Sequence, residues 1–410
     1  MPPSISATAA PSSVMGHAPF ARFWYARVSS GVAYQMLGVA VGWQIYSLTN
    51  SPWYLGLVGL AQFLPMFLLT LAVGHVADRY DRRRVARVCQ GVEGVAALVL
   101  AAGSFWGWQS KEGILAVVVV VGTARAFEGP TMLSLVPGLV PAEHFPRAAA
   151  WAASATQTAI VLGPAIGGFL YGAGATIVYG ASAVLFLAAV TFLTVIHTER
   201  QPPQNEPATL RSLFAGIAFI RSRPEILGAI SLDLFAVLLG GATALLPIYA
   251  RDILVTGPWG LGLLRSAPAA GALAISLYLA RYPLRRRVGR TMFASVAIFG
   301  LATLVFAVST SFLLSLVSLV ILGAADVISV VIRISLVQLG TPDEMRGRVS
   351  AVNSLFVGTS NQLGEFESGA TAALFGVVPA VLIGGVGTLI VVLAWMRFFP
   401  ELTRIDTLEP

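Results

Sequence analysis

The sequence predicts an all-α membrane protein with twelve transmembrane helices, arranged as two pseudo-symmetric six-helix bundles. Composition is the first observation: of 410 residues, 56% are hydrophobic and only 11% are charged, and the mean hydropathy is +0.80. A soluble globular protein carries about 25% charged residues, so this chain cannot cover a water-facing surface. The second observation is an internal repeat with a period of about 200 residues, which is typical of transporters built from two related bundles.

Two pairs of segments carry the repeat. The arginine cluster at 82–87 overlays 285–290 at an offset of 203, and residues 134–150 overlay 335–351 at an offset of 201. In the second pair a proline, a glutamate and an arginine recur at matching positions. The second half of the chain is therefore a repeat of the first half.

Apolar windows of about 20 residues predict the twelve spans. They cover residues 24–48, 53–74, 86–105, 113–136, 149–171 and 175–196 in the first half, and 226–249, 259–280, 290–309, 312–337, 348–372 and 376–397 in the second. The predicted organisation is a disordered tail over 1–19, a bundle over 20–197, a cytoplasmic linker over 198–224 with room for a short surface helix, a bundle over 225–398 and a tail over 399–410.

The net charge of +7 does not indicate a nucleic-acid-binding protein, because the basic residues form short clusters between apolar spans, as topogenic signals do. With both termini inside, twenty-one of the 26 Lys and Arg fall in internal loops and tails, and two, Lys111 and Arg251, fall in external loops. We therefore expect a multi-pass protein of a bacterial inner membrane with both termini cytoplasmic. Its surroundings are the lipid bilayer, with no nucleic acid as partner.

Ionisable residues inside predicted spans are the main candidates for function. We single out nine: Glu93, Arg125, Glu128, Asp233, Arg265, Asp326, Arg333, Glu365 and Glu367. Each costs about 2.5 to 3.5 kcal/mol at the bilayer centre, so each needs a partner or a role.

Five of the nine lie on spans four, seven and ten and are the predicted proton-coupling residues of a central cavity: Arg125, Glu128, Asp233, Asp326 and Arg333. Arg125 and Glu128 are three residues apart and can pair, and Asp326 and Arg333 are two turns apart on one face. The alternative is that these charges form ion pairs that only hold helices together. Arg265 and Glu93, which lie off the central spans, are expected to be structural.

Two further groups of residues are candidates for the cavity wall and for a gate. Tyr34, Gln35 and Gln44 on span one can contact a partly apolar substrate, although polar residues in spans are as often packing contacts. We interpret 74–84 as a tight polar loop in which Asp78 caps or pairs with a neighbouring helix when the cytoplasmic side closes. The alternative for this loop is topogenic charge alone.

These segments resemble motifs of the major facilitator superfamily. The signature between spans two and three is matched by Gly74, Asp78, Arg79, Arg82 and Arg83, with Asp81 where a second glycine is usual. Residues 125–129 resemble the span-four motif whose arginine serves proton coupling in that family. The span-five motif of exporters is matched by Gly163, Pro164, Gly167 and Gly168, with Ala159 in place of its usual first glycine. Segments 341–354 and 363–369 are similar to the bacterial branch that contains the enterobactin exporter.

The resemblance implies two bundles that rock around a midplane site and export driven by the proton gradient. We therefore predict a proton-coupled exporter (antiporter) of a small organic molecule such as a siderophore or drug-like amphiphile, acting as a monomer without a cofactor or metal. The alternative is a proton-coupled uptake symporter, or a facilitator, for a small nutrient. An enzyme is disfavoured because the four histidines lack metal-ligand spacing and the chain has no phosphate loop or nucleophile elbow.

Overall fold

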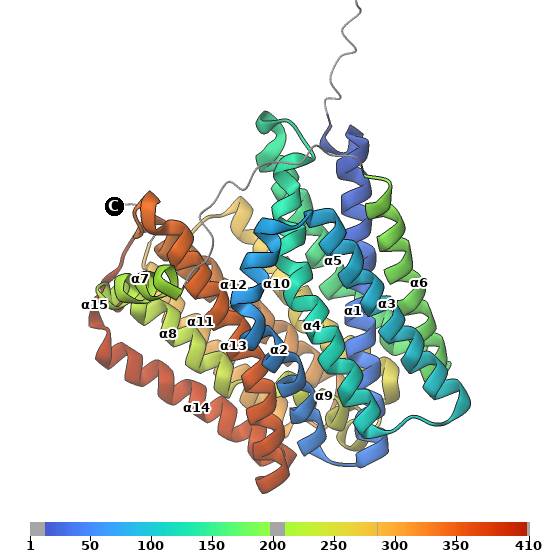
Figure 1. Ribbon diagram of the computed structural model, residues 1–410. Coiled ribbons are helices and arrows are strands. Elements are labelled where there is room, and N and C mark those ends of the chain that lie inside the picture. Colours follow the sequence, from blue (N-terminus) through green and yellow to red (C-terminus); the bar gives the residue numbers. More distant parts are fainter. Residues whose placement is uncertain (1–12, 197–209, 285, 408–410) are drawn as a thin grey trace, which may run out of the picture.

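Two bundles of long helices make up the computed structural model (Figure 1). It describes residues 13–196, 210–284 and 286–407, without the side chains of 70–72, 74, 75, 77, 78 and 210–213. The first bundle contains α1 (Ala18–Thr49), α2 (Pro52–Arg79), α3 (Arg82–Trp106), α4 (Lys111–Leu135), α5 (Phe145–Gly172) and α6 (Ala175–Thr194). The second contains α8 (Pro224–Leu239), α10 (Gly257–Arg281), α11 (Val288–Val308), α12 (Phe312–Leu339), α13 (Asp343–Phe375) and α14 (Val377–Phe398). We call them the N-bundle and the C-bundle.

The seventh span is broken, whereas the sequence predicts one continuous helix over 226–249. After α8 the chain passes Gly240–Gly241 and forms a 3-10 turn at Ala242–Leu245, the short α9 (Leu246–Ile248) and a π-helical turn at Tyr249–Ile253. Glycine costs about 1 kcal/mol in a helix interior, and the proline within α9 lacks the N–H that a continuous helix needs. The sequence thus contained the signal for this break.

The prediction of twelve spans is confirmed. In the described part of the chain ten helices are long and apolar enough to cross a membrane. The other two long helices run beside them: α1 packs along α5 and α6, and α13 packs along α2 and α8. With the broken segment from α8 to residue 253 counted as one span, each bundle contributes six.

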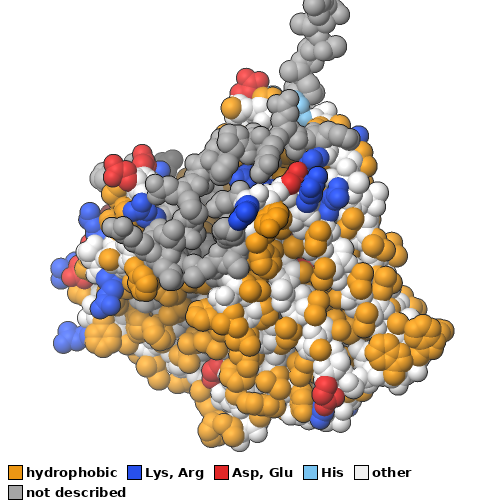
Figure 2. Space-filling model, viewed as in Figure 1, with side chains coloured by type: hydrophobic (Ala, Val, Ile, Leu, Met, Phe, Trp, Pro, Cys, Tyr) orange, Lys and Arg blue, Asp and Glu red, His pale blue; other side chains and the backbone are white. Residues whose placement is uncertain are grey.

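The spans end at two faces of the molecule. The termini face carries the start of α1, the link at 80–81 and α15 (Pro400–Arg404), and the opposite face carries the links at 50–51 and 107–110. Figure 2 shows basic side chains near the termini face in two groups, one at α7 (Leu210–Arg221) and α15 and one over the link between α2 and α3, and hydrophobic side chains over much of the helical flank. This distribution suits a protein embedded in lipid between two aqueous faces.

Three features of the termini face differ from or extend the sequence prediction. A 3-10 turn at Val14–Gly16 precedes α1 and Val14 is buried, so the predicted disordered tail over 1–19 is ordered from residue 13 onward, while 1–12 lie outside the described residues. The linker forms the 12-residue α7, which packs on α13. The predicted polar loop over 74–84 is wrong, because α2 continues to Arg79 and α3 begins at Arg82.

The two bundles meet most closely in the half nearer the opposite face. There α2 packs against α13 and α5 packs against α10. Glycines permit both contacts: a Cβ built on Gly369 would lie 2.4 Å from the Cα of Gly56, and one built on Gly168 would lie 2.8 Å from the Cα of Gly262. The Tyr46 hydroxyl of α1 also donates to the Asp252 carboxylate of the π-helical turn. The opposite face is therefore closed by backbone contact and by a polar bond.

Candidate substrate cavity and charge clusters

A cavity of about 240 Å³ lies inside the N-bundle between α1, α4 and α5, and we call it the N-bundle cavity. Its polar lining comes from Arg27, Ser30, Tyr34, Gln35, Arg125, Glu128 and Thr156, and its apolar lining includes Met132, Ala159 and Ile160. Arg27 lies nine residues after the start of α1, roughly 14 Å along the helix axis from the termini face. The cavity is therefore deep enough to lie within a membrane.

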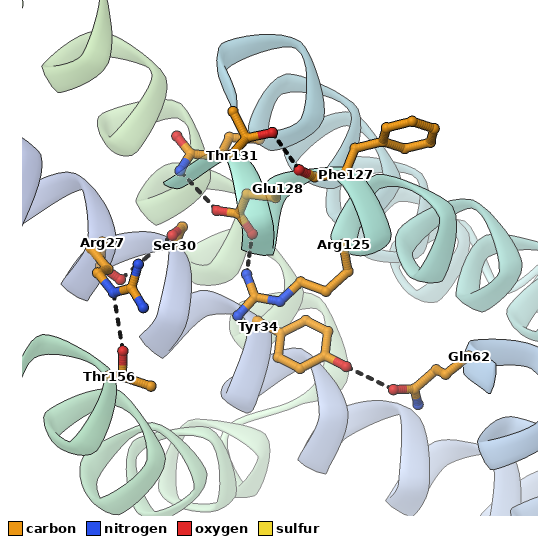
Figure 3. A network of polar contacts seen from close by, with 10 residues as sticks. Arg27, Ser30, Tyr34, Gln62, Arg125, Phe127, Glu128, Thr131 and Thr156 are labelled. Carbon is orange, nitrogen blue, oxygen red and sulfur yellow. Dashed lines mark hydrogen bonds and ion pairs between the residues drawn. The ribbon is translucent and has the colours of Figure 1, made fainter. Parts of the chain in front are cut away.

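Arg125 and Glu128 form the centre of a polar network at this cavity (Figure 3). The predicted pairing of these two residues is confirmed, because an N–H of Arg125 donates to Glu128 Oε2. Gln90 Nε2 of α3 donates to the other carboxylate oxygen at 2.9 Å. The guanidinium carbon of Arg125 also lies 4.4 Å from the centre of the Tyr34 ring, a cation–π contact. Glu128 is thus held from two sides and Arg125 is fixed over an aromatic face.

Arg27 is a cavity residue that the sequence analysis missed. Its Nε donates to Thr156 Oγ1 of α5 at 3.0 Å, and its side chain lines the same cavity as Arg125 (Figure 3). The sequence analysis counted it among the basic residues of the internal loops and tails. Its position inside the predicted span at 24–48 was the available signal that it belongs with the intramembrane charges.

Glu93 lies behind this network on α3. It is fully buried, and neither carboxylate oxygen has a hydrogen-bond partner among the described residues. It lies three residues along α3 from Gln90, whose side chain donates to Glu128. Glu93 was expected to be structural, and the structure places it beside the charge cluster of the N-bundle.

The C-bundle contains a second charge cluster on α8 and α12. Arg333 Nη1 lies 2.6 Å from Asp233 Oδ2, and both residues are buried. Asp326 and Asp233 line one small cavity of about 10 Å³ with Ser329 and Phe299. Asp326 and Arg333 thus face the same neighbour, as their spacing predicts. The two clusters stay within their own bundles, so none of the described cavities brings Arg125 and Asp326 together.

Two smaller cavities extend from the N-bundle cavity toward the bundle interface. One of about 40 Å³ shares Tyr34 and Gln35 with it and reaches Gln62 and Arg265. The next, of about 30 Å³, shares Gln62 and Arg265 and reaches Glu365 of α13. Tyr34 and Gln35 therefore line cavities as the sequence predicts. Arg265, expected to be structural, lies on the wall that both bundles share.

Gln44 does not take the cavity position that the sequence analysis expected. Its Nε2 donates to Ser104 Oγ at 3.1 Å, and its Oε1 accepts from the Tyr179 hydroxyl at 2.6 Å. Both groups of its amide are thus occupied by contacts between α1, α3 and α6. The residue packs the bundle because this turn of α1 faces α6 rather than the cavity.

The exporter-motif glycines of α5 sit between two other helices. A Cβ built on Gly163 would lie 2.5 Å from Gln35 Cβ, and one built on Gly167 would lie 2.8 Å from Met36 Cα, both on α1. Gly168 faces Gly262 of α10 instead. This motif therefore lets α5 approach α1 within its own bundle and α10 across the bundle interface.

The predicted gate residues that the structure describes bind within the N-bundle. Arg82 Nη1 donates to the carbonyl of Ser134 at 3.0 Å, and Arg83 donates to the carbonyl of Ile196. Arg79 is the last residue of α2. Gly74 lies in the helical part of α2, and the side chain of Asp78, the predicted latch, is outside the described residues.

Asp81 caps α3 directly after this segment. Its Oδ1 accepts from the backbone N–H of Arg83 at 2.8 Å and of Arg84 at 3.2 Å. Partial burial raises the pKa of the Asp81 carboxyl, but the two backbone N–H groups and the Arg83 guanidinium lower it more, so the pKa lies below its ordinary value. The departure from the family glycine at this position thus supplies a helix cap.

Comparison with known proteins gives whole-length matches. A family model described as "Transmembrane secretion effector" matches residues 8–409. The chain is 28% identical to the enterobactin exporter EntS of Citrobacter koseri and 26% identical to that of Shigella boydii, over 96% of this chain and 95% of each relative.

Solved structures share the fold. A bacterial homologue of the human lysosomal transporter Spinster, inward-facing and occupied, gives a TM-score of 0.73 at 14% identity over 94% of this chain and 96% of that one. A bacterial homologue of the iron transporter ferroportin gives 0.69 at 16% identity, over 94% and 99%.

Proposed function

Because the chain belongs to the transmembrane secretion effector family of the major facilitator superfamily, we propose that it exports a small organic molecule by alternating access in exchange for protons. Proteins of this superfamily are transporters and not enzymes. The enterobactin exporters to which the chain is similar support a siderophore or another small amphiphile as the substrate.

The observation that carries the proposal is a polar, charged cavity inside a bundle that is otherwise apolar. Arg27, Arg125 and Glu128 line it together. Ionisable groups within a membrane are costly and are typical of substrate and proton pathways. The lining also offers an aromatic ring and apolar side chains, which is the mixture that binds small organic ligands.

Charge distribution supports a topology with the termini face in the cytoplasm, which exporters and uptake transporters of this fold share. The termini face carries most of the arginines, so by the positive-inside rule it is the cytoplasmic face. The bundles close on each other at the opposite face, through the glycine contacts of α5 with α10 and α2 with α13. The conformation is thus the one that receives substrate from the cytoplasm.

Proton coupling is assigned to the two charge clusters. Protonation of Glu128 removes the charge that holds Arg125, and charge-assisted hydrogen bonds are about twice as strong as neutral ones. In the C-bundle, Asp326 lies beside the Asp233–Arg333 pair, so a proton on Asp326 lowers the repulsion between the two carboxylates. In each cluster the pairing of the charged side chains therefore differs between the protonated and the deprotonated state. A bound substrate can shift the equilibrium between these two states.

The test uses inside-out vesicles with an acidified lumen and a pH-sensitive dye, to which catecholate siderophores and lipophilic cations are added as separate panels. We expect one class to release lumenal protons with the wild type and not with Arg125→Ala or Asp326→Asn. Glu112→Gln, which removes an exposed carboxylate at the start of α4, serves as the control and keeps activity. If no panel compound moves protons, although counterflow from preloaded vesicles occurs, the uptake alternative replaces the proposal.

A further inference from the structure

Arg27 is a cation without an anionic partner in the part of the chain that the structure describes. None of the described ion pairs involves it, and the one hydrogen bond described for its side chain, through Nε, goes to the neutral Thr156 hydroxyl. Arginine cannot lose its proton in a protein, so Arg27 stays charged in its half-buried position. An anionic group bound beside its guanidinium would therefore form a charge-assisted hydrogen bond that no described residue supplies.

The other charges of the N-bundle cavity are already paired. Both oxygens of Glu128 accept a hydrogen bond, one from Arg125 and one from Gln90. Glu93 lies behind this pair on α3 and is not part of the cavity wall. Two guanidinium groups and one carboxylate thus face the cavity, which leaves a single positive charge at Arg27.

The rest of the wall fits an aromatic or apolar body with a few polar groups. Met132, Ala159 and Ile160 offer apolar contacts, and Tyr34 offers a ring. The cavity of about 240 Å³ is smaller than a typical site for a drug-sized ligand, which occupies about 300 to 1,000 Å³. The adjoining cavity past Tyr34, toward Arg265, gives the remainder of such a ligand a place.

We propose that the N-bundle cavity is a subsite for the anionic group of the substrate, that Arg27 binds this group, and that the transported compound is an organic anion with an apolar or aromatic body. The inference rests on the proposed function, since it names the substrate class of that transporter. A carboxylate or a phenolate suits the planar guanidinium, which presents two parallel N–H donors to such groups. A lipophilic cation would meet the unpaired positive charge instead.

Binding to the purified protein in nanodiscs, measured by calorimetry without any gradient, tests the subsite separately from transport. The probes are naphthalene-2-carboxylate, naphthalene-2-carboxamide and a naphthyl trimethylammonium, which share a ring system and differ in charge. We expect the carboxylate to bind at least tenfold more tightly than the other two. Arg27→Gln should remove at least tenfold of that affinity, and Arg27→Lys should restore part of it.

Arg22→Gln is the matched control. It removes the same charge from the same helix, at a residue whose guanidinium donates to the Val195 carbonyl outside the cavity. The proposed subsite is refuted by any of three results. These are equal carboxylate affinity in Arg27→Gln and wild type, tighter binding of the ammonium probe than of the carboxylate, and no carboxylate binding to the wild type. If the carboxylate binds through Arg27 but no compound is transported, the subsite stands and the proposed export fails.

Discussion

Gly168 allows the bundles to close at the opposite face, and alanine at this position should open it. A Cβ built on Gly168 would lie 2.5 Å from the carbonyl oxygen of Pro258, 2.8 Å from the Cα of Gly262 and 2.9 Å from its backbone nitrogen. In the same way a Cβ on Gly262 would lie 2.5 Å from the carbonyl oxygen of Pro164. All these atoms belong to the backbone and cannot rotate away, so Gly168→Ala forces α5 and α10 apart.

The size of the effect follows from the cost of overpacking. Forcing an extra carbon into a well-packed contact costs about 1 to 3 kcal/mol. Since this cost falls only on the conformation in which α5 and α10 touch, it reduces the population of that conformation by roughly 5- to 150-fold relative to the conformation open at this face. A protein that strongly favours the closed face would then occupy both states measurably.

Distances between spin labels report this population. Cys89 is the single cysteine and is buried, so Cys89→Ser provides a background for labels at Trp106→Cys in the N-bundle and Leu313→Cys in the C-bundle. Both sites are exposed at the opposite face. We expect double electron–electron resonance to show a longer distance between the labels in Gly168→Ala than in the glycine background.

Gly172→Ala is the control for helix propensity, because it lies one turn further along α5 and a Cβ there meets nothing within 4 Å. It should leave the distance distribution unchanged. If Gly168→Ala gives the background distribution, or if Gly172→Ala lengthens it equally, steric closure at this glycine contact is refuted.

Three further changes give outcomes that follow from single contacts. Tyr46→Phe removes the hydroxyl that donates to Asp252 across the bundles, and a hydrogen bond to a charged group is worth about 1.5 to 3 kcal/mol. The distance between the same pair of labels should therefore shift toward that of the open conformation. An unchanged distance would show that this bond does not stabilise the closed face. Asp233→Asn leaves the buried Arg333 without its counter-charge and should destabilise the purified protein by about 3 to 5 kcal/mol in a thermal melt. The double variant Asp233→Asn with Arg333→Gln should recover much of this loss. An unchanged melting temperature in Asp233→Asn would show that the pair is dispensable. Asp81→Ala should cost about 1 kcal/mol at neutral pH through loss of the α3 cap, while Asp81→Asn keeps the cap. The pKa of Asp81 lies below its ordinary value in the folded protein, so the charged Asp81 stabilises the fold more than Asn does at neutral pH. This stability difference declines below about pH 4 and is lost as the pH falls through the folded-state pKa. A difference in melting temperature between wild type and Asp81→Asn that grows on acidification would contradict this account.

Local spacing within one helix predicted contacts well, and contacts between helices were harder to predict. The pairing of Arg125 with Glu128 followed from their three-residue separation because helix geometry alone brings such residues together. The partner of Arg333 could not be named, since Asp233 stands on another helix whose rotation is set by packing. Gln44 was misplaced for the same reason.

Hydropathy predicted the number of spans but not where each span ends or is interrupted. Apolar windows located twelve spans, whereas the polar segment at 74–84 was taken for a loop although α2 continues through it to Arg79. A helix that leaves the apolar layer becomes polar without ending, so hydropathy alone misses its last turns. Arg27 was lost in the same way, as a basic residue near a span end was counted as a topogenic charge.

A substrate that brings its negative charge to Arg27 makes the exchange twice as sensitive to membrane voltage as the exchange of a neutral substrate for one proton. One anion leaves the cell while one proton enters, so two charges move in the direction that an inside-negative potential favours. Each elementary charge that crosses the membrane is worth about 2.3 kcal/mol per 100 mV. Export of this kind continues where the pH difference is small, and it slows when potassium and valinomycin collapse the voltage while the pH difference is kept.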